Sequence, residues 1–169
     1  MYAGHAALAL LAKAKRPSVP VALLVPVAFA PDWIEWVLSA LGQRNQEISH
    51  SLVSIGIGSV LVAVLYGAAR ADWGGAVAIW MTYVSHWAAD FLTGRKPTWP
   101  GGPSVGLYLY SKPVIDAALE FTVIAVCWLV YRQSLTRASR QRAIVYLVPL
   151  GLVAMHVAFL LVTSPVLRP

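Results

Sequence analysis

The residues with the clearest chemical potential are a histidine and a carboxylate four positions apart, His86 and Asp90. This spacing places both side chains on one face of a helix. The stretch before them, Trp73 to Val84, contains no charged residue, so we expect the pair to lie at or just below the surface of a lipid bilayer. Ionisable groups at that depth indicate a functional site. The alternative is a structural His–Asp hydrogen bond that joins two helices.

Two further pairs of acidic residues have helical spacing, Asp32 with Glu35 and Asp116 with Glu120. A charged side chain inside a bilayer costs at least ~2.5–3.5 kcal/mol, so three such pairs need compensation. A divalent cation would supply it, and imidazole and carboxylate ligands without thiolates suit zinc, manganese or iron. A network of ion pairs without metal is the competing interpretation.

The elements that must position these residues are apolar segments of helical length. We expect helices over residues 2–15, 19–30, 33–41, 48–69, 73–92, 113–131 and 143–163. Residues 93–112 form a long connection, which in a small protein is typically functional or a lid. Residues 132–142 form a basic linker, and residues 1–14 lack the basic start of a signal peptide, so we expect them to be retained.

Alternating membrane crossings would bring the polar residues to one surface. The segments that end or begin there carry Asp32, Glu35, His50, His86, Asp90, Asp116 and Glu120, and also His5 if the first helix crosses. His86, Glu120 and His156 would then each lie roughly 10 Å deep, at 1.5 Å per residue. A shared polar layer is therefore expected near one membrane face.

The composition agrees with a membrane protein, because 59% of the 169 residues are hydrophobic and 12% are charged. Soluble domains are about 25% charged. We predict an all-α fold, a single integral-membrane domain over residues 1–169, built as a polytopic transmembrane bundle of about five to six helices. The net charge of +6 does not indicate nucleic acid, because Lys and Arg lie at the ends of apolar segments. Cys127 is the only cysteine, which excludes an intramolecular disulfide and a cysteine-rich metal site.

The chain resembles the membrane-bound, metal-dependent hydrolases of the YdjM type, which are grouped more distantly with the zinc-dependent phospholipases C. The residues that carry the resemblance span about 4–113 and are Gly4-His5, Pro31-Asp32, Ser49-His50-Ser51, and Ser85-His86 through Asp90 to Thr93-Gly94. The resemblance implies a divalent metal, with zinc favoured and one to three ions, and the ligands His5, Asp32, His50, His86 and Asp90. Asn45 stands where the family has a further histidine, and the Pro-Asp segment continues as Trp33-Ile34-Glu35 without the second Asp that the family has two positions after Asp32, so the number of metals is open.

We predict that Glu120 is the general base, with Asp116 and Glu35 as supporting catalytic residues, since a desolvated carboxylate near a cation suits proton transfer. Arg95 and Lys96 follow the motif directly and are predicted to bind a substrate phosphate. A bound cation makes water nucleophilic at neutral pH. The expected activity is hydrolysis of an ester or phosphoester of a membrane lipid or amphiphile, and the lipid phosphoester is implied by the resemblance.

Three other functions fit the same residues: an ion- or proton-coupled transporter, a di-iron lipid oxygenase and a non-catalytic scaffold stabilised by metal. Four histidines are few for the oxygenase. We expect an integral protein of the bacterial inner (cytoplasmic) membrane. Eight basic residues lie opposite the site and five beside it, which predicts a site on the extracytoplasmic face. The oligomeric state does not follow from the sequence.

Overall fold

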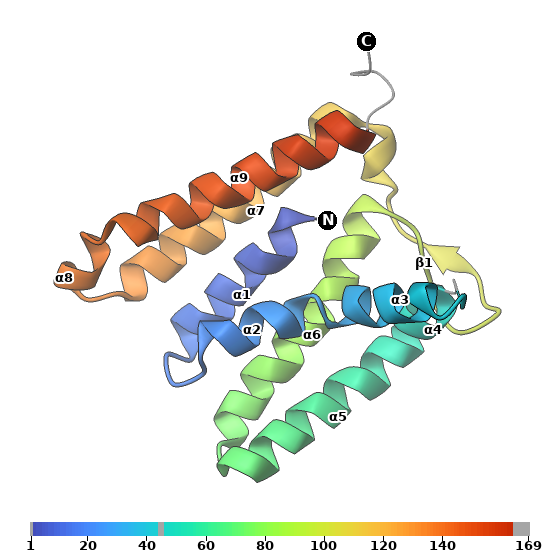
Figure 1. Cartoon of the computed structure of the whole chain (residues 1–169), viewed down its shortest axis with the longest axis horizontal. Helices are drawn as coiled ribbons and strands as arrows, with labels where there is room; N and C mark the ends of the chain where they lie inside the picture. Colours follow the sequence, from blue (N-terminus) through green and yellow to red (C-terminus); the bar gives the residue numbers. More distant parts are fainter. Residues whose placement is uncertain (1, 44–45, 164–169) are drawn as a thin grey trace.

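The computed structural model describes residues 2–43 and 46–163, and Asn45 lies outside these residues. The described part of the chain is almost entirely helical, which confirms the all-α prediction (Figure 1). The helices are α1 (Ala3–Lys15), α2 (Val21–Ala28), α3 (Ala30–Ala40), α4 (Gln46–His50), α5 (Leu52–Arg70), α6 (Trp73–Thr93), α7 (Pro113–Ser134), α8 (Arg137–Arg140) and α9 (Ala143–Thr163). Two short strands, β1 (Lys96–Pro97) and β2 (Ser104–Val105), and a 3-10 turn, η1 (Leu109–Ser111), complete them.

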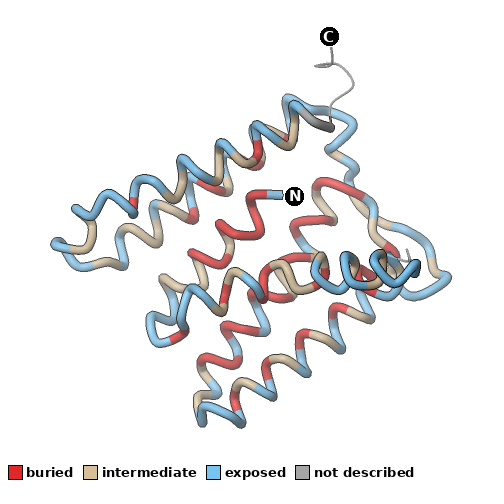
Figure 2. The backbone as a smooth tube through the Cα atoms, in the orientation of Figure 1, coloured by how far each residue is buried: buried red, intermediate tan, exposed pale blue. Residues whose placement is uncertain are grey.

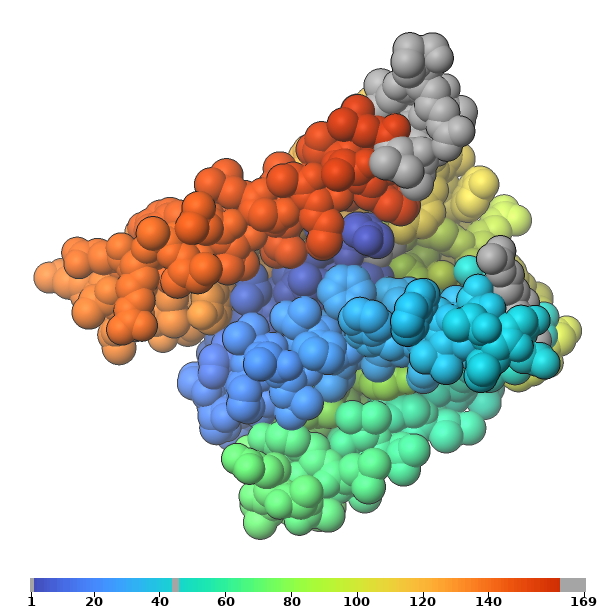
Figure 3. Space-filling model, in the orientation of Figure 1, coloured from blue at the N-terminus to red at the C-terminus, as the bar shows by residue number. Residues whose placement is uncertain are grey.

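Helix α1 is the central element, packed between α2 and α6 on one side and α7 and α9 on the other. Its buried positions are mostly small, including Ala3, Gly4, Ala6 and Ala7, so neighbouring backbones can approach closely. Figure 2 shows α1 as the most continuously buried helix, and in Figure 3 its neighbours cover much of it. A side chain on α1 is therefore packed against several neighbouring helices.

The outer surfaces of α5, α7 and α9 carry large apolar side chains, such as Ile57, Leu61, Val126 and Leu150. Contiguous apolar surface of this kind is unfavourable in water and normal against lipid tails. Among the described residues, these three helices are long and apolar enough to cross a membrane. The α2–α3 pair could form a fourth, bent span.

The predicted number of about five to six membrane-spanning helices was therefore too high. Helix α1 has 13 residues, about 20 Å at 1.5 Å per residue, and a span needs about 20 residues. Helix α6 has 21 residues but includes His86, Asp90 and several aromatic and polar side chains, which lower its average hydropathy.

Two breaks in the helices lie next to the predicted ligands. Helices α2 and α3 meet at Phe29 with a bend of 56°, and Pro31 occupies the first turn of α3, where its missing N–H is tolerated. The expected helix over residues 48–69 is interrupted at Ser51, which adopts an extended conformation and caps α5 by accepting a hydrogen bond from the Ser54 amide. The breaks place Asp32 in the first turn of α3 and His50 at the end of α4.

The connection over residues 93–112 contains a short β-hairpin followed by the turn η1. Strand β1 pairs antiparallel with β2. Gly106, with φ of +150°, passes so close to the Gly94 and Phe91 carbonyls that a Cβ would collide with them. The Leu107 amide donates to the Phe91 carbonyl at 2.8 Å, which fixes the hairpin to the end of α6.

Candidate metal centre

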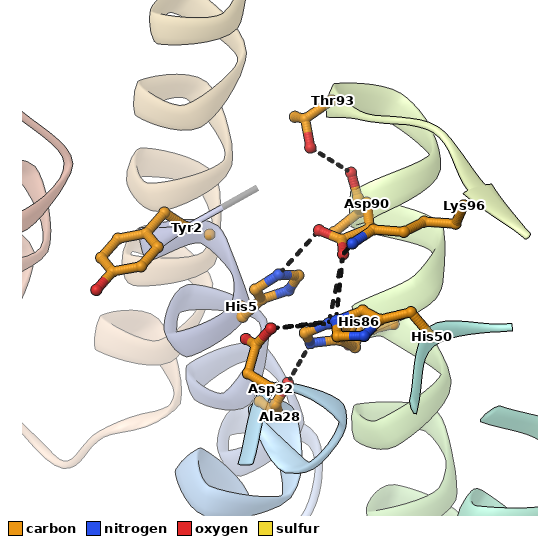
Figure 4. Close-up of polar contacts among 12 residues, drawn as sticks. Tyr2, His5, Ala28, Asp32, His50, His86, Asp90, Thr93 and Lys96 are labelled. Carbon is orange, nitrogen blue, oxygen red and sulfur yellow. Dashed lines mark hydrogen bonds and ion pairs between the residues drawn. The ribbon is translucent and has the colours of Figure 1, made fainter. Parts of the chain in front are cut away.

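Five polar side chains from four helices meet beside the start of α1 (Figure 4). They are His5 of α1, Asp32 of α3, His50 of α4, and His86 and Asp90 of α6. These are the five ligands that the sequence predicted. Four of the side chains are at most 8% exposed, whereas that of Asp32 is 47% exposed. The cluster is thus a buried site that opens to the surface at Asp32.

The Asp90 carboxylate lies at the centre of the cluster. Its Oδ1 lies 3.2 Å from His5 Nε2, and its Oδ2 lies 3.4 Å from His86 Nε2 and 4.0 Å from His50 Nε2. Asp32 Oδ1 closes the other side, 3.2 Å from His50 Nε2 and 3.7 Å from His86 Nε2. The rings of His5 and His86 stack with centroids 3.9 Å apart.

These separations fit donors around one ion. Atoms bound to zinc at about 2.0–2.2 Å in a tetrahedron lie about 3.3–3.6 Å from one another. Two triads have ligand atoms all within 4.8 Å of one another: His5 with Asp32 and His86, and His50 with His86 and Asp90. The residues present therefore suit a divalent cation.

His86 is oriented as a ligand by the bend between α2 and α3. Its Nδ1 lies 2.8 Å from the carbonyl oxygen of Ala28, the last residue of α2, so Nδ1–H donates and the Nε2 lone pair faces the cluster. Nε2 is fully buried and has no hydrogen-bond partner among the described residues. A buried nitrogen in this position is suited to binding a cation.

His50 is oriented by a relay that ends at Glu35. The Ser49 hydroxyl donates to Glu35 Oε2 at 2.6 Å and lies 2.7 Å from His50 Nδ1, from which it can accept. This leaves His50 Nε2 directed at Asp32. Glu35, predicted as a supporting catalytic residue, is thus placed behind a ligand, in the type of carboxylate–histidine arrangement that orients metal ligands.

We expect loss of this relay to weaken metal binding. Ser49→Ala and Glu35→Gln should each lower zinc affinity by ~10–100-fold, because His50 loses the partner that fixes its ring. Competition with a coloured chelator in detergent measures the affinity. Ser59→Ala is the control, since Ser59 is equally buried and bonds only within α5. Equal zinc affinity in the Ser49 and Ser59 variants would contradict the role of the relay.

His5 is held in the form that binds metals. Burial lowers the pKa of the imidazole from 6.5 to about 4, against the opposing effect of the Asp90 carboxylate. His5 is therefore neutral at pH 7, and neutral imidazole is the ligand form.

Glu120, the predicted general base, lies beside α1 rather than among the five ligands. Its carboxylate accepts hydrogen bonds from the amides of Tyr2 at 2.5 Å and Gly4 at 2.8 Å, and His156 Nδ1 lies 3.7 Å away. These amides belong to the first turn of α1, whose N–H groups have no partner within the helix. Glu120 thus fixes the turn that carries His5. Asp116 is buried on the same helix, and neither of its oxygens has a hydrogen-bond partner among the described residues.

The two acids should therefore differ in their effect on stability. Glu120→Ala leaves the α1 amides without their acceptor and should destabilise the protein by about 1–3 kcal/mol. Asp116→Ala removes a desolvated carboxylate that makes no described hydrogen bond, so stability should be unchanged or increased. Thermal unfolding in detergent, compared with wild type, measures both effects. If Glu120→Ala unfolds at the same temperature as Asp116→Ala, the proposed capping of α1 is wrong.

The two predicted phosphate-binding residues, neighbours in sequence, have different contacts. Lys96 Nζ lies 2.9 Å from Asp90 Oδ2, so its ammonium group is at the edge of the cluster. The Arg95 guanidinium instead lies over the Tyr108 ring, 5.7 Å from the centroid. Only Lys96 of the pair therefore contacts one of the five ligands.

The sequence interpretation missed two orienting groups, the Ala28 carbonyl and the Ser49 hydroxyl. The break before Pro31-Asp32 is a signal for the first, because carbonyls at a helix end lack intrahelical partners. The adjacency of Ser49 to His50 is a signal for the second, although it does not identify Glu35 as the acceptor.

No family model, no curated protein and no solved structure matches this chain.

Proposed function

We propose that the protein is a membrane-embedded, metal-dependent hydrolase that cleaves an ester or phosphoester of a lipid or amphiphile. The observation that carries the proposal is the convergence of three imidazoles and two carboxylates beside a lysine. Hydrolysis by a metal site requires a nucleophilic water, a group that accepts its proton, and positive charge near the oxygen that becomes negative. The cluster offers candidates for each requirement.

His5, Asp32, His50, His86 and Asp90 would hold the ion. Nitrogen and oxygen donors without sulfur favour zinc and also suit manganese or iron. Both triads depend on His86, whose Nδ1 is bonded to Ala28, so only Nε2 is free to bind a metal. Because one nitrogen lone pair can bind only one cation, we propose that the site holds a single ion. When bound, it supplies Lewis-acid activation of water and stabilises negative charge.

Two side chains of the site have proposed roles beyond holding the metal. Asp32 is the one carboxylate of the cluster that reaches the surface, and we assign it the acceptance of the water proton. Lys96 would donate a hydrogen bond to a phosphoryl or carbonyl oxygen, displacing its contact with Asp90. Glu120 is less suited to the proton transfer, because the Tyr2 and Gly4 amides engage its oxygens.

A lipid substrate fits the surroundings of the opening. Trp33, Trp36 and Trp99 have exposed side chains on α3 and the hairpin, the elements that carry Asp32 and Lys96. Exposed tryptophans are typical of the headgroup layer of a membrane. An amphiphile whose headgroup lies in that layer could present its ester to Asp32 and Lys96.

We further propose that the site is on the extracytoplasmic face of the cytoplasmic membrane. Helix α8 with Arg137 and Arg140, and the end of α1 with Lys13 and Lys15, lie at the other end of the bundle (Figure 1). Basic residues favour the cytoplasmic side. An accessibility tag at α8 that reports an extracytoplasmic position would overturn this orientation.

The competing function is an ion or proton pathway. The observation that favours it is the burial of Asp116 and His156, whose side chains have no described hydrogen-bond partner. Ionisable groups of this kind within a membrane also occur along transport routes.

The test is an assay of purified protein in lipid nanodiscs, loaded with zinc or manganese, against a panel of phospholipids and simple ester amphiphiles. Release of a headgroup or fatty acid that depends on metal supports the hydrolase. Bound metal without turnover of any substrate indicates a scaffold, and absence of metal indicates an ion pathway. Both results would contradict the proposal.

A further inference from the structure

A groove of about 600 Å³ lies between α1 and α6, away from the five ligands. Its walls are apolar side chains, including Leu8 and Leu11 of α1 and Val77 and Met81 of α6. The volume is within the ~300–1,000 Å³ typical of sites for small ligands. The groove is large enough to enclose part of an alkyl chain.

The polar atoms within the groove do not require a polar ligand. The Thr82 hydroxyl donates to the Ala78 carbonyl and the Ser85 hydroxyl to the Thr82 carbonyl, each at 2.7 Å. Both donors are therefore satisfied within α6, and their methyl and methylene groups are available to line the groove. Along its middle the groove suits an apolar occupant.

One end of the groove is cationic. Lys15 and Arg16 line it, and neither has an acidic side chain within ion-pair distance in the described parts of the chain. The Arg16 guanidinium lies directly against Gly74, where a Cβ would collide with it. The nearby Asp72 caps α6 by accepting from the Gly75 amide at 2.8 Å. The two positive charges thus border an apolar groove without a described counter-charge.

The cationic end is opposite the metal centre. Helix α1 carries His5 near its first residue and Lys15 at its last, and ten residues of helix separate them by about 15 Å. A headgroup held at Lys15 and Arg16 therefore lies about 15 Å along α1 from His5, away from the opening at Asp32. Such a molecule is distinct from a substrate of the metal centre.

We propose that this groove binds an anionic phospholipid, with its phosphate on Lys15 and Arg16 and one acyl chain between α1 and α6. Charge complementarity at one end and an apolar wall along the rest select this class of molecule. Helices α1 and α6 carry His5, His86 and Asp90. The bound lipid would therefore stabilise the packing of the two helices that supply three of the five ligands. The proposal does not depend on whether the metal centre is catalytic.

Native mass spectrometry of protein released from detergent tests the proposal, with phosphatidylglycerol and phosphatidylcholine added in equal amounts. Wild type should retain phosphatidylglycerol preferentially. Lys15→Ala and Arg16→Ala should each reduce that preference about fivefold, from ~1 kcal/mol for each cation near a membrane surface. Met81→Trp should fill the groove and reduce retention of both lipids, while keeping the charges.

Arg70→Ala is the matched control, because Arg70 is a basic residue at the same end of the bundle but does not line the groove. It should retain the wild-type preference. An unchanged preference in the Lys15 and Arg16 variants would overturn the proposal. An equal loss in Arg70→Ala would also overturn it, since that result indicates attraction by the whole basic surface.

Discussion

Hydrolysis of a membrane phospholipid by the zinc-loaded protein is expected to fall by ~10²–10³-fold or more when His86 is replaced with alanine. Loss of a single stabilising donor in a hydrolytic site has an effect of this size. His86 belongs to both possible triads and presents its only available nitrogen to the site. Its loss should therefore remove the ion and, with it, the activation of water.

The control for this prediction is His156→Ala. His156 is also fully buried but contacts Glu120 rather than the five ligands. Its replacement should leave metal-dependent turnover in the folded fraction near that of wild type. Undiminished turnover in His86→Ala would show that the hydrolysis occurs elsewhere or that His86 is structural.

The second large effect is expected at Lys96, where metal binding and turnover should separate. Lys96→Met removes the ammonium group proposed to stabilise the oxygen that becomes negative, so turnover should fall by ~10²–10³-fold. Metal content should be retained or increased, because a positive charge 2.9 Å from Asp90 Oδ2 opposes a bound cation. Turnover per bound zinc, measured with elemental analysis of the same sample, distinguishes the two effects.

Arg95→Met supplies the comparison, since Arg95 is the neighbouring cation but lies over Tyr108. We expect it to keep both metal and turnover. If both variants lose turnover equally, general positive charge near the opening explains the effect. If Lys96→Met loses its metal as well, Lys96 supports the site rather than the reaction.

The long helices could be predicted from the sequence because length and apolar composition determine them locally. The first helix was expected over residues 2–15 and occupies Ala3–Lys15, and the helix that ends at Thr93 was expected to end at residue 92. The number of membrane spans was less predictable. The sequence pattern predicted that α6 crosses and left open whether α1 does. Among the described residues, α1 is too short and α6 too polar to meet the length and hydropathy of a membrane span.

A gathering of polar residues near one face could be anticipated from the alternation of the helices, and the choice of these five among them followed from the family resemblance. The groups that orient them could not be anticipated. The relay from His50 through Ser49 to Glu35 depends on the break at Ser51, and the approach of Lys96 depends on the hairpin held at Gly106. The bonding of Glu120 to the α1 amides depends on how α7 packs against α1, which is a tertiary contact without a local sequence signal.

Elemental analysis of detergent-purified protein tests most directly whether this cluster is a metal centre. The samples are wild type and the His86→Ala/Asp90→Ala double variant, each before and after reconstitution with zinc, manganese or iron. We expect close to one ion per wild-type chain and only background in the variant. A wild-type protein without metal after reconstitution would contradict the metal centre, and so would equal metal in both proteins.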